Sequence, residues 1–214
     1  MTLSAKPPIL AILSDLVQVV VDEGDNWPTA HRLAEYAEVD AQSIHRHMFV
    51  DHPEVFGEYT RGRMTHEAYR ARIVAELGLR CTDAQFDAAF SEVFEPIAPI
   101  VALWRRLRAE RIRLVAASNI EAHRYARLRT MGIHDLFDAH CLSFEIGWSK
   151  PAPEFFKRAV ALARVPASTA LLVDDRPANV EAAIQAGMHA ILYDKGDHAA
   201  FVRDLEMHAL IPSP

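Results

Sequence analysis

Short apolar runs alternate with longer amphipathic stretches along most of this 214-residue chain. Four runs are rich in branched aliphatic side chains and span residues 8–14, 112–117, 170–173 and 189–193. Apolar runs of this length are typical of strands that are buried on both faces. Helical patterns lie between and after them, at 97–110, 121–131, 151–164, 178–186 and 199–208. This alternation predicts an α/β fold with a parallel sheet flanked by helices.

The segment from 23 to 95 has a different pattern, with helical periodicity and no convincing strand. Thr82 followed by Gln85 has the form of a capping box, which marks a helix N-terminus. We therefore expect a helical domain at 23–95, inserted into an α/β core made of 1–22 and 96–214. The absence of Gly-rich or Ser-rich linkers in the sequence predicts a short hinge at each end of the insert.

Composition narrows the classes of function. The formal net charge is −6, which disfavours nucleic acid as a partner. The two cysteines, Cys81 and Cys141, lie far apart in unlike contexts and indicate no disulfide framework. The apolar run near the N-terminus is too short for a signal peptide or a membrane span. We expect a cytoplasmic protein without a membrane partner.

Polar residues follow three of the four apolar runs directly. They are Asp15 after the first, Ser118 and Asn119 after the second, and Asp174 and Asp175 after the third. Ligands of open parallel sheets bind beyond the carboxyl ends of the strands, so these side chains are candidates for one site. A single Asp at a strand end more often caps a turn or a helix. The order and spacing of all these residues together, rather than any one of them, indicate a site.

The chain resembles the haloacid dehalogenase (HAD) superfamily, and the resemblance covers nearly all of it. The residues that resemble the four superfamily motifs are 12–19, 114–119, 149–154 and 171–183. The resemblance implies a Rossmann-like core. The position of the insert, directly after the first motif, resembles the members that carry a small helical cap.

The resemblance also implies a division of roles. Asp15 is the expected nucleophile, which forms an aspartyl-phosphate. Lys150, in the turn before a helix, is expected to hold Asp15 and a phosphoryl oxygen as a fixed positive charge. The hydroxyl of Ser118 and the backbone N–H of Asn119 are expected to donate hydrogen bonds to another phosphoryl oxygen.

Three carboxylates at one dry sheet edge cannot all remain ionised without a cation. The oxygen ligands of Asp15, Asp174 and Asp175 suit Mg²⁺, and the backbone carbonyl of Val17 is a further expected ligand. The expected partner is a small phosphorylated metabolite, bound by a monomer or a homodimer.

Val17 departs from the pattern of most phosphatases in the superfamily, which carry an Asp there as general acid and base. Loss of such help typically costs ~10²–10⁴ in rate. The next residue, Gln18, replaces a usual Gly and is a candidate for substrate contact, as are Arg61 and Arg63 in the turn of the insert. Histidines of the insert, such as His45, are possible substitute acids, although neutral surface histidines are the default interpretation.

Three interpretations remain open. The first is an Mg²⁺-dependent phosphatase whose leaving group needs little protonation, such as a sugar 1-phosphate. The motif at 15–19 resembles that of bacterial α-D-glucose-1-phosphate phosphatases, which also lack the second Asp. The second is a 2-haloacid dehalogenase, although such relatives need no metal and lack the Asp174–Asp175 pair. The third is a binding or regulatory module with weakened catalysis.

Overall fold

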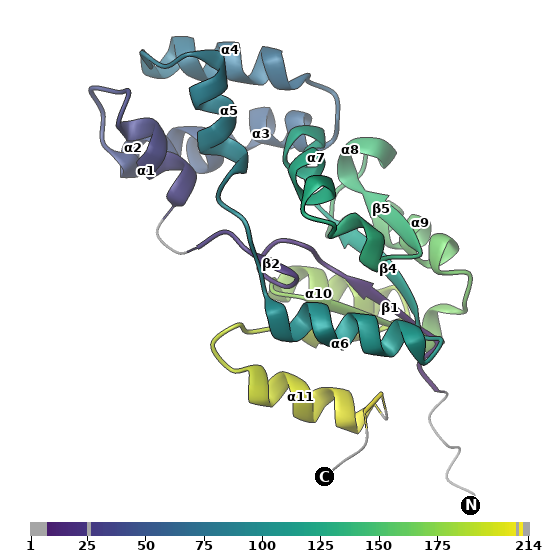
Figure 1. Cartoon of the computed structure of the whole chain (residues 1–214). Helices are drawn as coiled ribbons and strands as arrows, with labels where there is room; N and C mark the ends of the chain where they lie inside the picture. Colours follow the sequence, from purple (N-terminus) through teal and green to yellow (C-terminus); the bar gives the residue numbers. More distant parts are fainter. Residues whose placement is uncertain (1–7, 25–26, 209, 212–214) are drawn as a thin grey trace, which may run out of the picture.

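The structure, a computed structural model, describes residues 8–24, 27–208 and 210–211; residues 1–7 of the expected core lie outside that range. A five-stranded parallel sheet forms its centre (Figure 1). The strand order is β5-β4-β1-β6-β7. The strands are β1 (Ala11–Ser14), β4 (Arg113–Ser118), β5 (Ala139–Leu142), β6 (Ala170–Asp174) and β7 (His189–Leu192). The predicted α/β fold with a parallel sheet is confirmed.

Helices cover both faces of this sheet, because alternate residues of each buried strand point to opposite sides. Ile12 belongs to one apolar cluster and Leu13 to the other. The helices on the Ile12 side are α6 (Ala98–Ala109), α7 (Ala122–Thr130) and α11 (His198–Met207). Those on the Leu13 side are α9 (Pro153–Ala163) and α10 (Pro177–Gln185). The three central strands β4, β1 and β6 therefore end at one dry, rigid edge.

Strand β5 was not anticipated from the sequence. It is four residues long and contains His140, and its first two residues are only partly buried. A short 3₁₀ helix, His134–Leu136, comes just before it. An edge strand with one polar residue in four positions lacks the continuous apolar pattern of a central strand, and so the pattern alone does not reveal it.

Within the described residues five α-helices form the insert, which is called the cap from here on. They are α1 (Pro28–Ala34), α2 (Ala41–Arg46), α3 (Pro53–Thr60), α4 (His66–Leu77) and α5 (Asp83–Ser91), and a π-helical turn, His47–Asp51, joins α2 to α3. Thr82 and Gln85 form the predicted capping box at the start of α5. The cap has an apolar core of its own, separate from the two clusters of the sheet, which includes Tyr69, Phe86 and Phe90.

The two chain segments between the cap and the core pair with each other. β2 (Val21–Asp22) and β3 (Glu95–Pro96) form a two-stranded antiparallel sheet at the two ends of the insert. The sequence showed no convincing strand here because each strand is only two residues long. This pairing holds the entering and leaving chains together where the insert joins the core.

Gly62, in the turn after α3, makes a close backbone contact between cap and core. Its φ is +72°, and a Cβ atom there would lie 2.2 Å from the carbonyl oxygen of Phe144 in the short helix α8 (Ser143–Ile146). A side chain at this position would therefore be strained and would also clash with the core.

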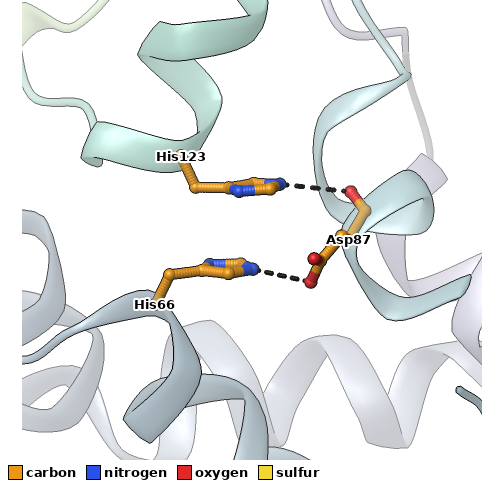
Figure 2. Close-up of side chains that lie close together, drawn as sticks. All are labelled: His66, Asp87 and His123. Carbon is orange, nitrogen blue, oxygen red and sulfur yellow. Dashed lines mark hydrogen bonds and ion pairs between the residues drawn. The ribbon is translucent and has the colours of Figure 1, made fainter. Parts of the chain in front are cut away.

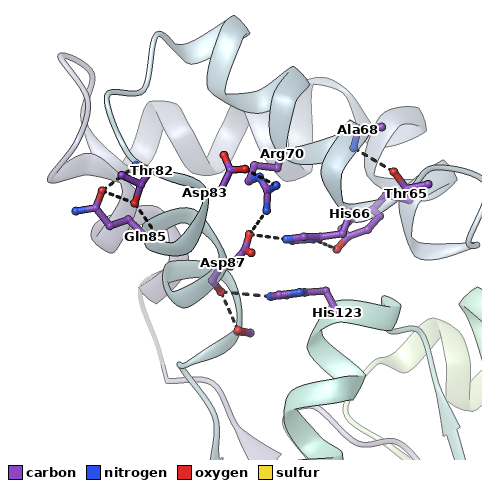
Figure 3. Close-up of polar contacts among 11 residues, drawn as sticks. Thr65, His66, Ala68, Arg70, Thr82, Asp83, Gln85, Asp87 and His123 are labelled. Atoms are coloured by element: carbon purple, nitrogen blue, oxygen red, sulfur yellow. Dashed lines mark hydrogen bonds and ion pairs between the residues drawn. The ribbon is translucent and has the colours of Figure 1, made fainter.

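A second contact between cap and core is a pair of histidines. The rings of His66 on α4 and His123 on α7 stack with centroids 3.8 Å apart and an interplanar angle of 5° (Figure 2). His66 Nε2 lies 2.8 Å from Asp87 Oδ1, and the same carboxylate oxygen accepts a hydrogen bond from Arg70 at 2.6 Å (Figure 3). Because the two rings are parallel, their nitrogen lone pairs do not converge on one point. In addition, Arg70 already binds the Asp87 carboxylate. We therefore interpret this cluster as a cap–core contact rather than a metal site.

No helix among the described residues is long and apolar enough to span a bilayer.

Candidate active site

Asp15 follows β1 at the centre of the carboxyl edge of the sheet. Its backbone N–H donates to the carbonyl of Val173 on β6 at 2.9 Å, which extends the strand pairing to this residue. Its Oδ1 atom accepts two hydrogen bonds of 2.7 Å, from the Ser118 hydroxyl on β4 and from the backbone N–H of Leu16. The carboxylate plane is therefore fixed by neighbouring strands, and the side chain is almost fully buried.

Lys150 is the cation at the base of the site. Its side chain is fully buried, and its Nζ lies 3.0 Å from Oδ2 of Asp15 and 2.5 Å from Oδ2 of Asp174. Burial lowers the pKa of Lys150, but the two carboxylates outweigh this effect and raise it. The amine therefore remains charged, as the expected role requires.

Asp174 ends β6, and hydrogen bonds fix the orientation of its carboxylate. Its Oδ1 accepts from the Arg176 backbone N–H and from the side-chain amide of Asn179, both at 2.9 Å. α10 begins at Pro177 and its N-cap residue is Arg176, so Asn179 lies inside the helix, where its side-chain amide supports the carboxylate of Asp174.

The three carboxylates lie close enough to bind one cation. Each of Asp15, Asp174 and Asp175 offers an oxygen, and these atoms are all within 4.8 Å of one another. Burial raises the pKa of Asp15 to about 6, opposed by Lys150 and reinforced by Asp174. Burial and Asp174 also raise the pKa of Asp175. One buried lysine does not offset this repulsion, and a hard divalent ion with oxygen ligands, such as Mg²⁺, fits the site.

A cavity of about 620 Å³ opens above Asp15, between the core and the cap. The core contributes Asp15, Val17 and Asp175 to its wall. Its cap side is mostly apolar and aromatic, with Trp27, His45, Pro53, Phe49 and Phe56. Such a mixture of an acidic base and an apolar roof suits a small molecule with a charged end.

Gln18 lies on this wall in an uncommon backbone conformation. Its φ is +64°, in the left-handed region that favours glycine. Its backbone N–H donates to the carbonyl of Val21 at 2.7 Å, which closes the tight turn after β1. The turn geometry thus explains why glycine is the usual residue here, and Val17 beside it also lines the cavity.

Of the remaining predicted contact residues, Arg61 and Asn119 line the cavity and Arg63 does not. Arg61 lines the cavity and pairs with Glu58 at 2.8 Å. Arg63 is exposed, also pairs with Glu58, and is not among the residues described as lining the cavity. Asn119 lines the cavity, but its side-chain amide binds both backbone groups of Lys150, at 2.7 and 2.8 Å, and so positions the lysine loop.

A second polar group in the cavity was not predicted from the sequence. Glu121, Arg124 and Glu23 line its wall, and the first two are buried. A signal existed in the position of Glu121, three residues beyond Ser118, at a strand-to-helix turn of the carboxyl edge. Its burial, however, depends on contact with cap helix α3 and could not be derived from the pattern.

The match to a family model settles the relationship. Residues 9–187 match the model of the haloacid dehalogenase-like hydrolases. The chain belongs to this family. Two relatives are a phosphatase and a nucleotidase by name. A sesquiterpene phosphatase of Aspergillus oryzae is 27% identical over 63% of this chain and 70% of its own. A pyrimidine 5'-nucleotidase of Escherichia coli is 26% identical over 70% of this chain and 67% of its own.

Solved structures of HAD enzymes share the fold. A HAD family enzyme from Bacteroides thetaiotaomicron, in complex with magnesium and inorganic phosphate, superposes with a TM-score of 0.78 at 22% identity, over 88% of this chain and 96% of its own. The L-2-haloacid dehalogenase of Xanthobacter autotrophicus superposes with a TM-score of 0.65 at 18% identity, over 95% and 85%. At these identities the likeness supports the α/β fold and does not distinguish between the reactions.

Proposed function

We propose that this HAD-family hydrolase is an Mg²⁺-dependent phosphatase that acts on a small phosphorylated metabolite through a phosphorylated Asp15. The observation that carries the proposal is the arrangement of Asp15, with its oxygen atoms held by Ser118 and Lys150, at the base of the cavity. An oriented carboxylate beside a fixed cation is what nucleophilic attack on a phosphorus atom needs.

In the first step, an oxygen of Asp15 attacks phosphorus and the bond from phosphorus to the ester oxygen breaks. In the second step, water attacks the phosphorus of the aspartyl-phosphate, which releases phosphate and restores Asp15. Lys150 neutralises negative charge on Asp15 and on the phosphoryl group throughout. Asp15, Asp174 and Asp175 would hold Mg²⁺, which would supply further charge neutralisation at the phosphoryl group.

The leaving group sets the substrate class. Val17 has no proton to give, so a substrate whose leaving oxygen is a comparatively stable anion reacts fastest. Sugar 1-phosphates and acyl phosphates have this property, and we propose a sugar 1-phosphate as the preferred substrate. The three carboxylates of Asp15, Asp174 and Asp175 support phosphoryl transfer over dehalogenation, because displacement of a halide needs no metal ion beside the nucleophile.

The test is a small substrate panel. Purified protein with Mg²⁺ is offered sugar 1-phosphates, sugar 6-phosphates, acetyl phosphate and 2-chloropropionate. Phosphate release that is fastest from the 1-phosphates, and that stops with EDTA, is the expected result. Chloride release without metal would establish a dehalogenase instead. A protein that binds Mg²⁺ and beryllofluoride but turns over no substrate would be a binding module.

A further inference from the structure

Glu121 is a buried carboxyl group in the wall of the cavity that contains Asp15. It occupies the N-cap position of α7, yet its side chain makes no capping hydrogen bond there. Only 2% of the residue is exposed. Its side chain therefore does not cap α7.

The hydrogen bonds of Glu121 are incomplete. Its Oε1 atom accepts from the hydroxyl of Thr60 on cap helix α3 at 3.1 Å, whereas its Oε2 atom has no hydrogen-bond partner among the described residues. A buried polar atom without a partner typically costs ~1–3 kcal/mol. A ligand that enters the cavity and hydrogen-bonds to Oε2 would remove this cost.

Arg124 does not neutralise Glu121 by direct contact. Arg124 pairs with Glu23, and its guanidinium lies 4.5 Å from the ring centroid of Phe94. Within the described ranges no ion pair joins Arg124 to Glu121. Burial raises the pKa of Glu121, and the charge of Arg124 and the hydrogen bond from Thr60 oppose this rise without cancelling it. Glu121 therefore keeps a proton to a higher pH than an exposed glutamate does.

Other groups around Glu121 are poorer proton donors. Burial and the charge of Glu121 push the pKa of Tyr59 and of Tyr69 above their ordinary values, so both phenols hold their protons tightly. His45 lines the same cavity and stacks on Trp27 at 4.5 Å. Burial lowers the pKa of His45, so near neutral pH this ring has no spare proton to give.

The position of Glu121 suits the leaving group. In phosphoryl transfer the attacking and leaving oxygens are roughly in line, so the leaving oxygen points away from Asp15 and the sheet. Thr60 belongs to the cap, and its bond to Glu121 places this carboxyl group at the cap side of the cavity.

We propose that Glu121 is the catalytic acid and base that replaces the one missing at Val17. This inference rests on the proposed phosphatase function and widens its substrates to esters with ordinary alkoxide leaving groups. As the bond from phosphorus to the leaving oxygen breaks, Glu121 gives that oxygen its proton and the alcohol departs. The Glu121 carboxylate then takes a proton from the attacking water, whose oxygen bonds to phosphorus as the bond to Asp15 breaks, and both side chains return to their starting states.

The test compares two esters of similar shape in a single turnover with Mg²⁺. p-Nitrophenyl phosphate has a leaving group that needs no proton, and benzyl phosphate has one that does. In Glu121→Gln the first-turnover release of nitrophenol stays within about tenfold of the wild type, whereas release of benzyl alcohol falls by ~10²-fold or more. Later turnovers slow with both esters, and intact-protein mass spectrometry shows accumulated aspartyl-phosphate.

Three comparisons keep the inference falsifiable. In the wild type, hydrolysis of benzyl phosphate declines at high pH because Glu121 loses its proton. Glu121→Asp retains a carboxyl group and therefore shows the same decline, whereas Glu121→Gln does not. His45→Gln leaves the ratio of the two first-turnover rates unchanged. Beryllofluoride binding in the presence of Mg²⁺ verifies that each variant has an intact site. An equal loss with both esters, or no loss, in an otherwise active enzyme overturns the role of Glu121 alone. A wild type that releases phosphate from no ester overturns the proposed function itself, and this inference with it.

Discussion

The Nζ atom of Lys150 lies 3.0 Å from the Oδ2 atom of Asp15, and the lysine side chain has no exposed surface. A buried ammonium of this kind is stabilised only because carboxylates surround it. The site, however, holds more negative than positive charge, since Asp174 and Asp175 are present as well. Chemistry at Asp15 therefore depends on a balance of charges that a divalent ion completes.

The first prediction concerns the nucleophile. Asp15→Asn removes the attacking oxygen while it preserves the size of the side chain, so phosphate release falls on the order of 10³-fold or more, as with loss of the nucleophile in other covalent enzymes. The measurement is steady-state phosphate release with Mg²⁺ on the best substrate of the panel. Circular dichroism and a thermal melt verify the fold, and activity near that of the wild type would contradict the assignment.

The second prediction is a pH dependence of stability without metal. The pKa of Asp15 is about 6 in the folded protein against an ordinary value of 3.8, so the folded state holds a proton that the unfolded chain loses between these values. The resulting stabilisation is complete below about pH 3.8 and is lost as the pH rises through about 6. The difference between a pKa of 3.8 and one of about 6 corresponds to ~3 kcal/mol.

Urea denaturation between pH 4 and 7 measures this contribution. Asp15→Asn lacks it, so the free energy of unfolding of this variant declines less with rising pH in EDTA. Mg²⁺ binds the ionised carboxylates, so at pH 7 a concentration a hundredfold above Kd adds about 2.7 kcal/mol to the stability of the wild type. Parallel curves for wild type and variant would show that Asp15 does not carry the shift.

The acidic site was accessible to sequence reasoning because parallel strands end at a common edge. Asp15 follows β1 and Asp174 ends the neighbouring strand β6, so the parallel pairing of these strands brings the two residues side by side at the sheet edge. Strand β5 was missed because its pattern is mixed and its place at the sheet edge is decided by tertiary contacts.

The burial of Glu121 could not be predicted from local sequence patterns. Its position in the chain is compatible with a solvated helix N-cap, which is the ordinary role of a polar residue after a strand. Only the approach of α3, and the hydrogen bond from Thr60, bury its side chain in the cavity. Contacts between cap and core join residues far apart in the sequence, and no local periodicity encodes them.

The third prediction concerns the turn after β1. Gln18 has a φ of +64°, which costs a side chain with a Cβ roughly 1–2 kcal/mol. Gln18→Gly relieves this strain but increases the freedom of the unfolded chain, which offsets ~0.4–1 kcal/mol. The net expectation is a small rise in the free energy of unfolding, measured by urea denaturation. Gln18→Ala, which keeps the strain, is the control, and an equal gain from both substitutions would contradict the strain.

The fourth prediction separates two sources of the catalytic proton. Val17→Asp introduces an acid at the position used by most phosphatases of the superfamily and raises hydrolysis of benzyl phosphate by up to ~10²-fold. With Glu121 as the native acid, the gain from Val17→Asp is larger in the Glu121→Gln background than in the wild type, because the two groups serve the same leaving oxygen. Equal gains in both backgrounds would show that the two residues act independently.

The fifth prediction concerns the histidine pair between cap and core. Burial and the neighbouring ring of His66 lower the pKa of His123, and Arg70 on the adjoining helix acts in the same direction. The backbone carbonyl and carboxylate of Asp87 oppose this shift without reversing it. Two stacked imidazoles at 3.8 Å cannot both be charged without strong repulsion (Figure 2).

The sign of the effect follows from the direction of this shift. The unfolded chain takes up a proton at His123 near its ordinary pKa of 6.5, before the folded protein does. The contribution of the neutral ring to stability is therefore complete above pH 6.5 and is lost as the pH falls below it, opposite in sign to the contribution of Asp15. Urea denaturation of the Mg²⁺-saturated protein from pH 7.5 to 5.5 measures it. His123→Gln, which stacks without titrating, should lose less stability over this range than the wild type. If both lose the same amount, the titration lies elsewhere, and His140→Gln, which removes one ring of the second stacked pair (His134 and His140), is the next variant to compare.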